Sequence, residues 1–138
     1  MKFTDGNWLI ASGVVPHHPA QAYDVTTDGD SLVVTAPTRP IRHRGDTLQG
    51  PVLTMRLSSP LENVIRVRIE HFTGGTERDP KIPLFTGPAP EVHIQHTEEA
   101  STLRSGGLTA RVARGDTWEL SFWRGDRRIT RSGFRGIG

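Results

Sequence analysis

Apolar and polar residues alternate along most of this sequence with a period of two. The strictest run covers residues 65–70, in which Ile, Val and Ile alternate with Arg, Arg and Glu. Because successive side chains of a strand point to opposite faces, such a run predicts a half-buried strand of an antiparallel sheet. The same alternation recurs in residues 31–36, 51–58, 92–94, 108–112 and 118–122. Helical spacing of apolar residues is never sustained over about ten residues, which excludes an all-parallel α/β fold.

Short turns rich in glycine and aspartate separate the alternating segments. They occur at Asp28-Gly29-Asp30, Gly74-Gly75, Gly106-Gly107, Gly115-Asp116 and Gly125-Asp126. Glycine adopts the positive φ values that tight hairpins require, so these turns favour antiparallel connections. About nine short strands spaced by roughly ten residues predict an all-β fold, an antiparallel β-sandwich or barrel. Two longer connections, residues 37–50 and 74–90, interrupt this rhythm, and the second holds four prolines, too many for a central strand.

The composition excludes several classes of protein and of functional site. The chain has 138 residues, 15 glycines, 10 prolines and no cysteine, and 34% of its residues are hydrophobic. This length suits one domain, and the missing cysteines exclude a disulfide framework, a thiolate nucleophile and a cysteine-ligated zinc site. The apolar runs are too short for a membrane-spanning helix, and the polar start Met1-Lys2-Phe3-Thr4-Asp5 does not resemble a signal peptide. We therefore expect a small soluble domain of cytoplasmic location, without a membrane partner.

Arginines are concentrated in two places, although the formal net charge is only +2. They are Arg39, Arg42 and Arg44 in the first long connection, and Arg124, Arg127, Arg128, Arg131 and Arg135 near the C-terminus. Such clusters suggest a phosphate-binding strip and hence a nucleic-acid-binding barrel. Nucleic-acid modules interleave aromatic residues for base stacking, whereas the aromatic residues here fall mainly on predicted core faces. Pairing of arginines with acids on neighbouring strands is the simpler interpretation, and we predict no nucleic-acid partner.

The histidines do not form a convincing metal site. His93 and His96 lie three residues apart in a predicted strand, so their side chains face opposite sides of the sheet and cannot chelate one ion together. His17 and His18 stand between two prolines in an extended stretch, where neighbouring side chains diverge. A third ligand at a useful spacing is missing, so we predict neither a metal nor a cofactor.

No nucleophile or acid–base pair stands out either. Ser12, Ser105 and Ser132 precede glycines, but none lies in the Gly-x-Ser-x-Gly motif that exposes a catalytic serine. Many of the aspartates fall in turns, where their carboxylates accept hydrogen bonds from local backbone N–H groups. Glu70 and Glu119 lie on the polar faces of strands. We therefore predict no catalytic residue in this chain.

Three aromatic side chains offer a different possibility, a flat platform on which a sugar ring stacks. Trp8, Tyr23 and Trp123 are the candidates, since Trp118 and Phe122 belong to a predicted core face. Packing in the core and at sheet edges is the commoner role of aromatic residues in a small sandwich. A stand-alone carbohydrate-binding module is the alternative function that remains open.

Four segments resemble, in chain order, the amino-terminal region of bacterial α-xylosidases of glycoside hydrolase family 31. The opening decapeptide and the arginine-rich strand at residues 64–72 are the most specific, and residues 51–60 resemble the strand before it. In the fourth segment the matching positions are Ser105-Gly106, Leu108, Ala110-Arg111-Val112, Gly115, Trp118, Leu120, Phe122 and Arg128-Ile129-Thr130. The resemblance implies that residues 1–138 are an N-terminal β-sandwich domain of the mutarotase-like or supersandwich type, or part of one.

The resemblance also implies what the larger protein does. Enzymes of this family cleave terminal α-linked xylose with retention of configuration, using two aspartates on a (β/α)8 barrel that follows the β-domain. That barrel is absent from this chain, so no catalytic role passes to any of its residues, and we expect the fragment itself to be inactive. We expect the domain to pack against the barrel, close to the mouth at which the parent enzyme binds its α-xyloside substrate. The enzyme is expected to be a homo-oligomer.

In this family the β-domain continues past the position that matches Gly138. A sandwich that ends within its domain leaves strand edges and an apolar face that the rest of the enzyme would cover. We therefore expect the fold to be incomplete at its C-terminus. The isolated fragment should either self-associate or have at least one poorly covered edge.

Overall fold

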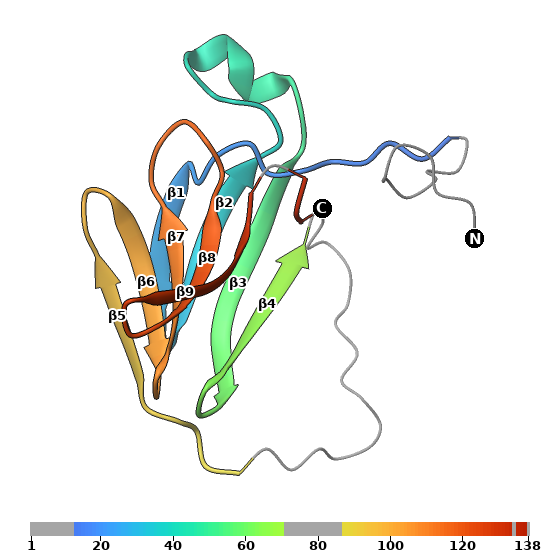
Figure 1. The fold of residues 1–138 in the computed structure, drawn as a ribbon. Coiled ribbons are helices and arrows are strands. Elements are labelled where there is room, and N and C mark those ends of the chain that lie inside the picture. The colour runs from blue at the N-terminus through green and yellow to red at the C-terminus, as the bar shows by residue number, and fades with distance from the viewer. Residues whose placement is uncertain (1–12, 71–86, 134, 138) are drawn as a thin grey trace.

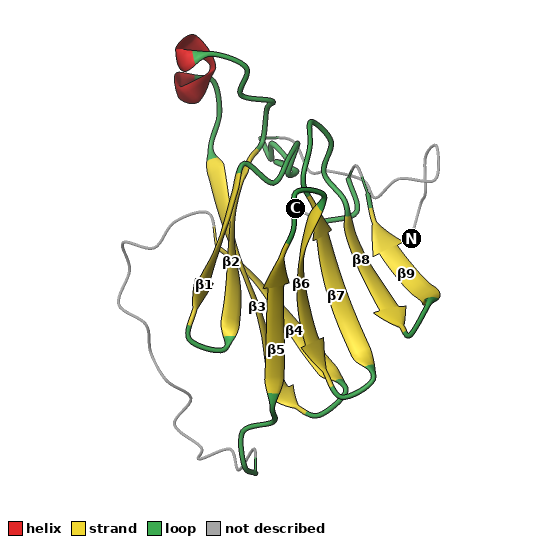
Figure 2. Cartoon of the chain, turned by 90° about the vertical axis from the view of Figure 1, so that its left-hand side faces the viewer, coloured by secondary structure: helices red, strands yellow, loops and turns green. Residues whose placement is uncertain are grey.

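The computed structural model describes residues 13–70, 87–133 and 135–137. Within these residues the chain forms nine strands and one short 3-10 helix. The strands make two antiparallel sheets that face each other, as Figures 1 and 2 show from two sides. The prediction of an all-β antiparallel sandwich is confirmed.

The first sheet has four strands whose order in space follows their order along the chain. They are β1 (Asp24–Asp28), β2 (Ser31–Pro37), β3 (Val52–Leu61) and β4 (Val64–Glu70). Tight hairpins join β1 to β2 and β3 to β4, whereas the connection from β2 to β3 is long and contains the 3-10 helix η1 (Arg44–Leu48). The long connection that the sequence predicts at residues 37–50 is therefore present.

The second sheet has five strands, and each pairs with the next one along the chain. They are β5 (Val92–His96), β6 (Ala100–Ser105), β7 (Leu108–Ala113), β8 (Leu120–Arg124) and β9 (Arg127–Ser132). Glycines with positive φ close two of its hairpins, Gly106 (φ +56°) and Gly125 (φ +55°), as the sequence predicts. The predicted turn at Gly74-Gly75 lies outside the described residues.

The core lies between the sheets and is made from alternate residues of their strands. The fully buried apolar side chains include Leu32, Val34 and Ala36 of β2, Met55 and Leu57 of β3, Leu103 of β6, and Ala110 and Val112 of β7. Each large side chain of this kind contributes about 1.5–3 kcal/mol relative to leaving it exposed. The faces that the alternation predicts for residues 32–36, 53–57 and 110–112 are the faces that the structure buries.

One predicted strand begins later than the alternation indicates. Residues 118–122 alternate as a strand would, yet β8 starts only at Leu120. Trp118 lies in the preceding loop, where it is 2% exposed and its backbone N–H donates to the carbonyl of Ala20 at 2.7 Å. That bond joins the second sheet to the segment before β1, so a tertiary contact takes the place of the strand ladder at Trp118.

The two sheets do not overlap over their whole width. β6 packs over β2 and β3, and β7 packs over β4. The second sheet continues with β8 and β9 beyond this overlap, as Figure 2 shows. On this side Phe122 of β8 is half-buried and Ile129 of β9 is 55% exposed.

Candidate interaction surfaces

The outer face of the second sheet carries two rows of polar and basic side chains. The strand registers place them opposite one another across all five strands. One row is His93, Arg104, Thr109, Trp123 and Arg128, and the other is Gln95, Thr102, Arg111, Ser121 and Arg131. We call this surface the basic face.

Trp123, the exposed aromatic candidate of the sequence, lies in the first row of the basic face. Its indole Nε1 donates to Ser121 Oγ at 2.9 Å, and the guanidinium carbon of Arg128 lies 5.8 Å from the ring centroid. This is the geometry of a cation–π contact, which covers part of the ring. Tyr23 is 56% exposed, and its backbone N–H donates to Thr35 of the other sheet at 3.0 Å. The structure does not bring Tyr23 and Trp123 together into one platform, and Trp8 lies outside the described residues.

Several arginines pair with acids, but of Arg56, Arg111 and Arg131 only Arg131 belongs to the two clusters that the sequence shows. Arg111 lies 3.8 Å from Glu99, and Arg131 lies 3.6 Å from Glu119. On the first sheet, Arg56 donates to Asp28 across β2 at 2.6 Å. These side chains are largely solvated, so each pair contributes little to stability and leaves the surface open to a charged partner.

A polar hollow of about 350 Å³ lies at the end of the sandwich where β5 begins. Its lining includes two carboxylates, Glu62 and Glu91, with His93 and Arg104. Glu91 Oε1 lies 3.4 Å from His93 Nε2, but the side chains are 84% and 48% exposed. Glu62 is also exposed. The hollow is a solvated polar surface.

The same end of the molecule is held together by polar bonds between the sheets. Asn63, in the β3–β4 turn, has φ +62°, and its side-chain oxygen accepts from the N–H of Gly107 at 2.8 Å. The hydroxyls of Ser59 and Ser105 lie 2.8 Å apart. Ser105, one of the three serines considered as nucleophiles, is fully buried in this contact and has a structural role. Of the other two, Ser132 has a buried hydroxyl and Ser12 lies outside the described residues.

The two histidines of β5 point to opposite faces, as their spacing predicts. His93 lies on the basic face, whereas His96 faces the first sheet. His96 Nδ1 lies 2.9 Å from Ser101 Oγ, and its Nε2 lies 2.9 Å from Thr27 Oγ1 of β1. His96 therefore bridges the two sheets. Within the described residues no group of three or more histidines, aspartates and glutamates is placed to hold a metal ion.

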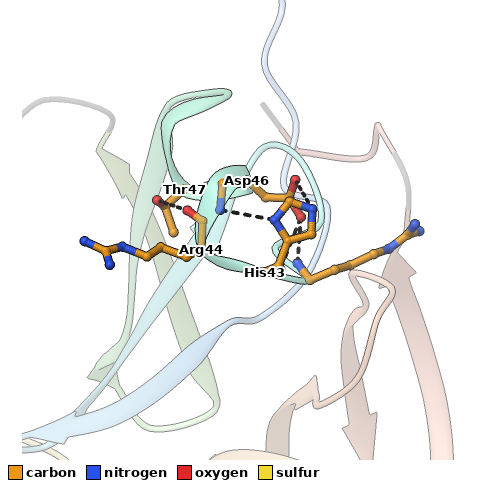
Figure 3. A network of polar contacts seen from close by, with 6 residues as sticks. His43, Arg44, Asp46 and Thr47 are labelled. Carbon is orange, nitrogen blue, oxygen red and sulfur yellow. Dashed lines mark hydrogen bonds and ion pairs between the residues drawn. The ribbon is translucent and has the colours of Figure 1, made fainter.

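His43 and Asp46 organise the long connection between β2 and β3 (Figure 3). Asp46 Oδ2 accepts from the backbone N–H groups of Arg42 at 3.0 Å and His43 at 3.3 Å, and His43 Nδ1 accepts from Gly45 N–H at 3.1 Å. The bond from Arg42 is the main reason why the pKa of Asp46 lies below its usual value of 3.8. Thr47 Oγ1 donates to the carbonyl of Arg44 at 2.8 Å. The helix η1 thus has a reciprocal cap at its start.

The cap of η1 is not among the features predicted above, although the sequence contains a signal for it. The spacing of His43 and Asp46 is that of a capping box, in which one side chain bonds forward and another three residues later bonds back. The histidine in place of the usual serine or threonine hides the pattern. The bridge from His96 to Thr27 has no such local signal, because it joins residues far apart in the sequence.

Among the residues that the structure describes, one side of the sandwich ends in two edge strands, β4 and β9. Ile65, Val67 and Ile69 of β4 are only partly buried, and five of the six residues of β9 are exposed. The backbone groups on the free side of an edge strand are available to another strand. We call β4 and β9, with the half-buried side chains between them, the open side.

These features define a class of protein before any comparison: an antiparallel β-sandwich with charged outer faces and one open side. Comparison with known proteins then gives the relationship. Over 132 residues, 96% of its length, the chain is 33% identical to the α-xylosidase XylQ of Lactiplantibacillus pentosus. Over 99 residues, 72% of its length, it is 33% identical to an α-xylosidase of Emericella nidulans. The chain is an α-xylosidase-related region.

The comparison also sets the scale of the relationship. The chain spans 17% of the length of XylQ and 12% of the length of the Emericella enzyme. No family model matches the chain. In the part of the chain that the structure describes, no helix has the length and apolar character needed to cross a bilayer.

Proposed function

We propose that the chain is the non-catalytic N-terminal β-domain of a retaining α-xylosidase of glycoside hydrolase family 31. One observation carries this proposal. The similarity to XylQ takes in 96% of the chain but only 17% of that enzyme, as expected if the chain corresponds to one region of a much larger hydrolase. The resemblance of residues 1–10 to the amino terminus of this family's enzymes supports an N-terminal position.

The surfaces support a packing role for this domain. The carboxylates of the polar hollow are solvated, and the buried serine at the same end is used in a contact between the sheets. The open side, by contrast, has edge strands and half-buried isoleucines that a neighbouring part of the enzyme can cover. In this proposal the open side and the outer faces bind the catalytic part of the enzyme. The domain also forms one wall near the mouth of the substrate-binding site.

A reading-frame and product analysis tests the proposal. We expect the gene to continue into a catalytic region, and the complete enzyme to release xylose from aryl α-xylosides. NMR of the first product should show α-xylose, because a retaining enzyme forms a covalent intermediate and inverts twice. Release of β-xylose as the first product, or a complete protein that hydrolyses no α-xyloside, would overturn the proposal.

A further inference from the structure

The connection between β2 and β3 projects beyond the end of the sandwich. Figures 1 and 2 show it standing clear of both sheets, with η1 at its far end. No residue of η1 is buried, and Leu48 is 93% exposed, more than any other large hydrophobic residue in the described part of the chain. We call residues 38–50 the Leu48 loop.

The loop is held by its own hydrogen bonds at both ends. At the tip, His43 and Asp46 form the reciprocal cap described above. At the base, the backbone N–H and the hydroxyl of Thr38 both donate to the carbonyl of Pro51, at 3.1 and 3.0 Å. A projection that is already ordered loses little conformational entropy when it binds. The Leu48 loop is preorganised in this sense.

The outer surface of the loop is basic, because its arginines are exposed and its one carboxylate is hydrogen-bonded within the loop. The carboxylate of Asp46 is directed at backbone N–H groups of the loop itself, whereas Arg42 and Arg44 are exposed. At the base, Arg39 lines a hollow of about 280 Å³ together with His17 and Arg135. The loop therefore exposes both an apolar side chain and cationic side chains, the two kinds of group that form the centre and the rim of a contact patch.

A single exposed leucine is common on protein surfaces and would carry no inference by itself. Leu48 differs because it is 93% exposed on a preformed projection that also carries exposed arginines. The chain also spans only 17% of its relative XylQ, so most of such an enzyme lies outside this structure and has to meet the domain somewhere.

We propose that the Leu48 loop is a docking element for the catalytic part of the same enzyme. Leu48 enters an apolar hollow there, and carboxylates at the rim of that hollow bind Arg42 and Arg44. The inference rests on the proposed function, because it requires the larger enzyme to exist. It goes beyond that function by naming the contact and the chemistry of the surface that receives it.

Footprinting of the complete enzyme tests the proposal. Hydroxyl-radical oxidation of Leu48 and amide exchange over residues 42–49 are compared with those of the 138-residue chain. We expect both to slow by about tenfold or more in the enzyme, since docking protects the loop. In amide exchange over residues 42–49, the Leu48→Asp variant of the enzyme should lose the protection and Leu48→Met should keep most of it, because methionine fills an apolar hollow and aspartate does not.

Charge reversal separates the two parts of the contact. The Arg42→Glu/Arg44→Glu double variant should also lose protection, and more at low than at high salt, because exposed charges are screened. The matched control is Leu61→Asp, at an exposed leucine in the opposite end of the sandwich, which should leave the loop protected.

The outcomes distinguish this inference from the proposed function. An enzyme that hydrolyses α-xylosides while Leu48 is oxidised as fast as in the 138-residue chain overturns the docking element alone. Protection that appears only at protein concentrations at which the enzyme self-associates also overturns it, in favour of a second copy as the partner. A complete protein without α-xylosidase activity overturns the proposed function instead.

Discussion

Single side chains at the boundary between the sheets have a larger role than their sequence positions suggest. His96 bridges β5 to β1, Asn63 binds the turn after β6, and Trp118 fills the core from a loop. Each lies at or beside a strand end, next to or within a connection between neighbouring strands of one sheet. The burial of such a residue depends on both sheets. The loss of unfolding free energy on substitution therefore differs sharply between residues of the same type.

Two tryptophans only five residues apart illustrate this at the residue scale. Trp118 is 2% exposed in the core, whereas Trp123 lies half-buried on the basic face under Arg128. We expect Trp118→Ala to lower the free energy of unfolding by about 3–5 kcal/mol, as large-to-small core substitutions do. Trp123→Ala, the matched control, should cost about 1 kcal/mol or less because it removes mainly a surface contact. Urea unfolding measures both, and equal losses would contradict the burial described here.

The Trp118 indole provides a second comparison. Its Nε1 is buried without a hydrogen-bond partner among the described residues. A buried donor without a partner is unfavourable, so Trp118→Phe removes that unfavourable group together with some packing. We expect Trp118→Phe to lower the unfolding free energy by clearly less than Trp118→Ala does, again by urea unfolding.

Asp46 supplies a prediction about pH. Its folded pKa lies below 3.8 because the backbone N–H of Arg42 donates to the carboxylate. A depressed folded pKa means that this interaction is fully present above the unfolded value and is lost as pH falls through the lower folded value. We expect the NMR titration of the Asp46 carboxyl to have its midpoint below 3.8, and the amide signals of Arg42 and His43 to shift with it. A midpoint at or above 3.8 would show that the cap of the Leu48 loop does not form.

At the scale of the elements, much of the fold follows from the sequence. Alternation shows which residues of β2, β3 and β7 face the core, and the glycine turns locate the hairpins at Gly106 and Gly125. Both signals are local, because each depends on neighbours along one strand or across one turn. The arrangement of one sheet on the other depends on distant residues, so the bridge at His96 and the late start of β8 could not be predicted.

In the candidate sites, too, features that depend on local spacing could be predicted, whereas features that depend on distant residues could not. The opposite orientations of His93 and His96 follow directly from the spacing along one strand, and the structure has them. The separation of Tyr23 from Trp123 depends on which sheet each joins, and local pattern gives no information about that. The sequence could therefore nominate a sugar platform, but only the fold shows that these two rings do not form one.

The open side leads to a prediction about self-association. Without the rest of an enzyme, edge strands β4 and β9 have free backbone groups beside half-buried apolar side chains. We expect the 138-residue chain to self-associate as its concentration rises, measured by sedimentation velocity. Ile129→Lys should reduce the association without unfolding the chain, because Ile129 is 55% exposed and a charge on an edge discourages pairing. A chain that remains monomeric at every concentration would contradict this role of the open side.

At the scale of the whole molecule, the sandwich has the surface features expected of one region of a larger enzyme. Its outer faces are charged, one side is open, and one loop projects beyond the strands. Its similarity to two α-xylosidases covers 96% and 72% of the chain, and 17% and 12% of the length of those enzymes. In the function proposed above, catalysis takes place elsewhere in the enzyme, and this region supplies contacts that support the catalytic part.

The measurement that tests this account most directly compares hydrolysis of one aryl α-xyloside by two proteins. One is the purified 138-residue chain, and the other is the complete enzyme at the same molar concentration. We predict turnover by the complete enzyme and no release above the uncatalysed rate by the chain alone. Steady turnover by the 138-residue chain, proportional to its concentration and unchanged after a further purification step, would contradict the central claim.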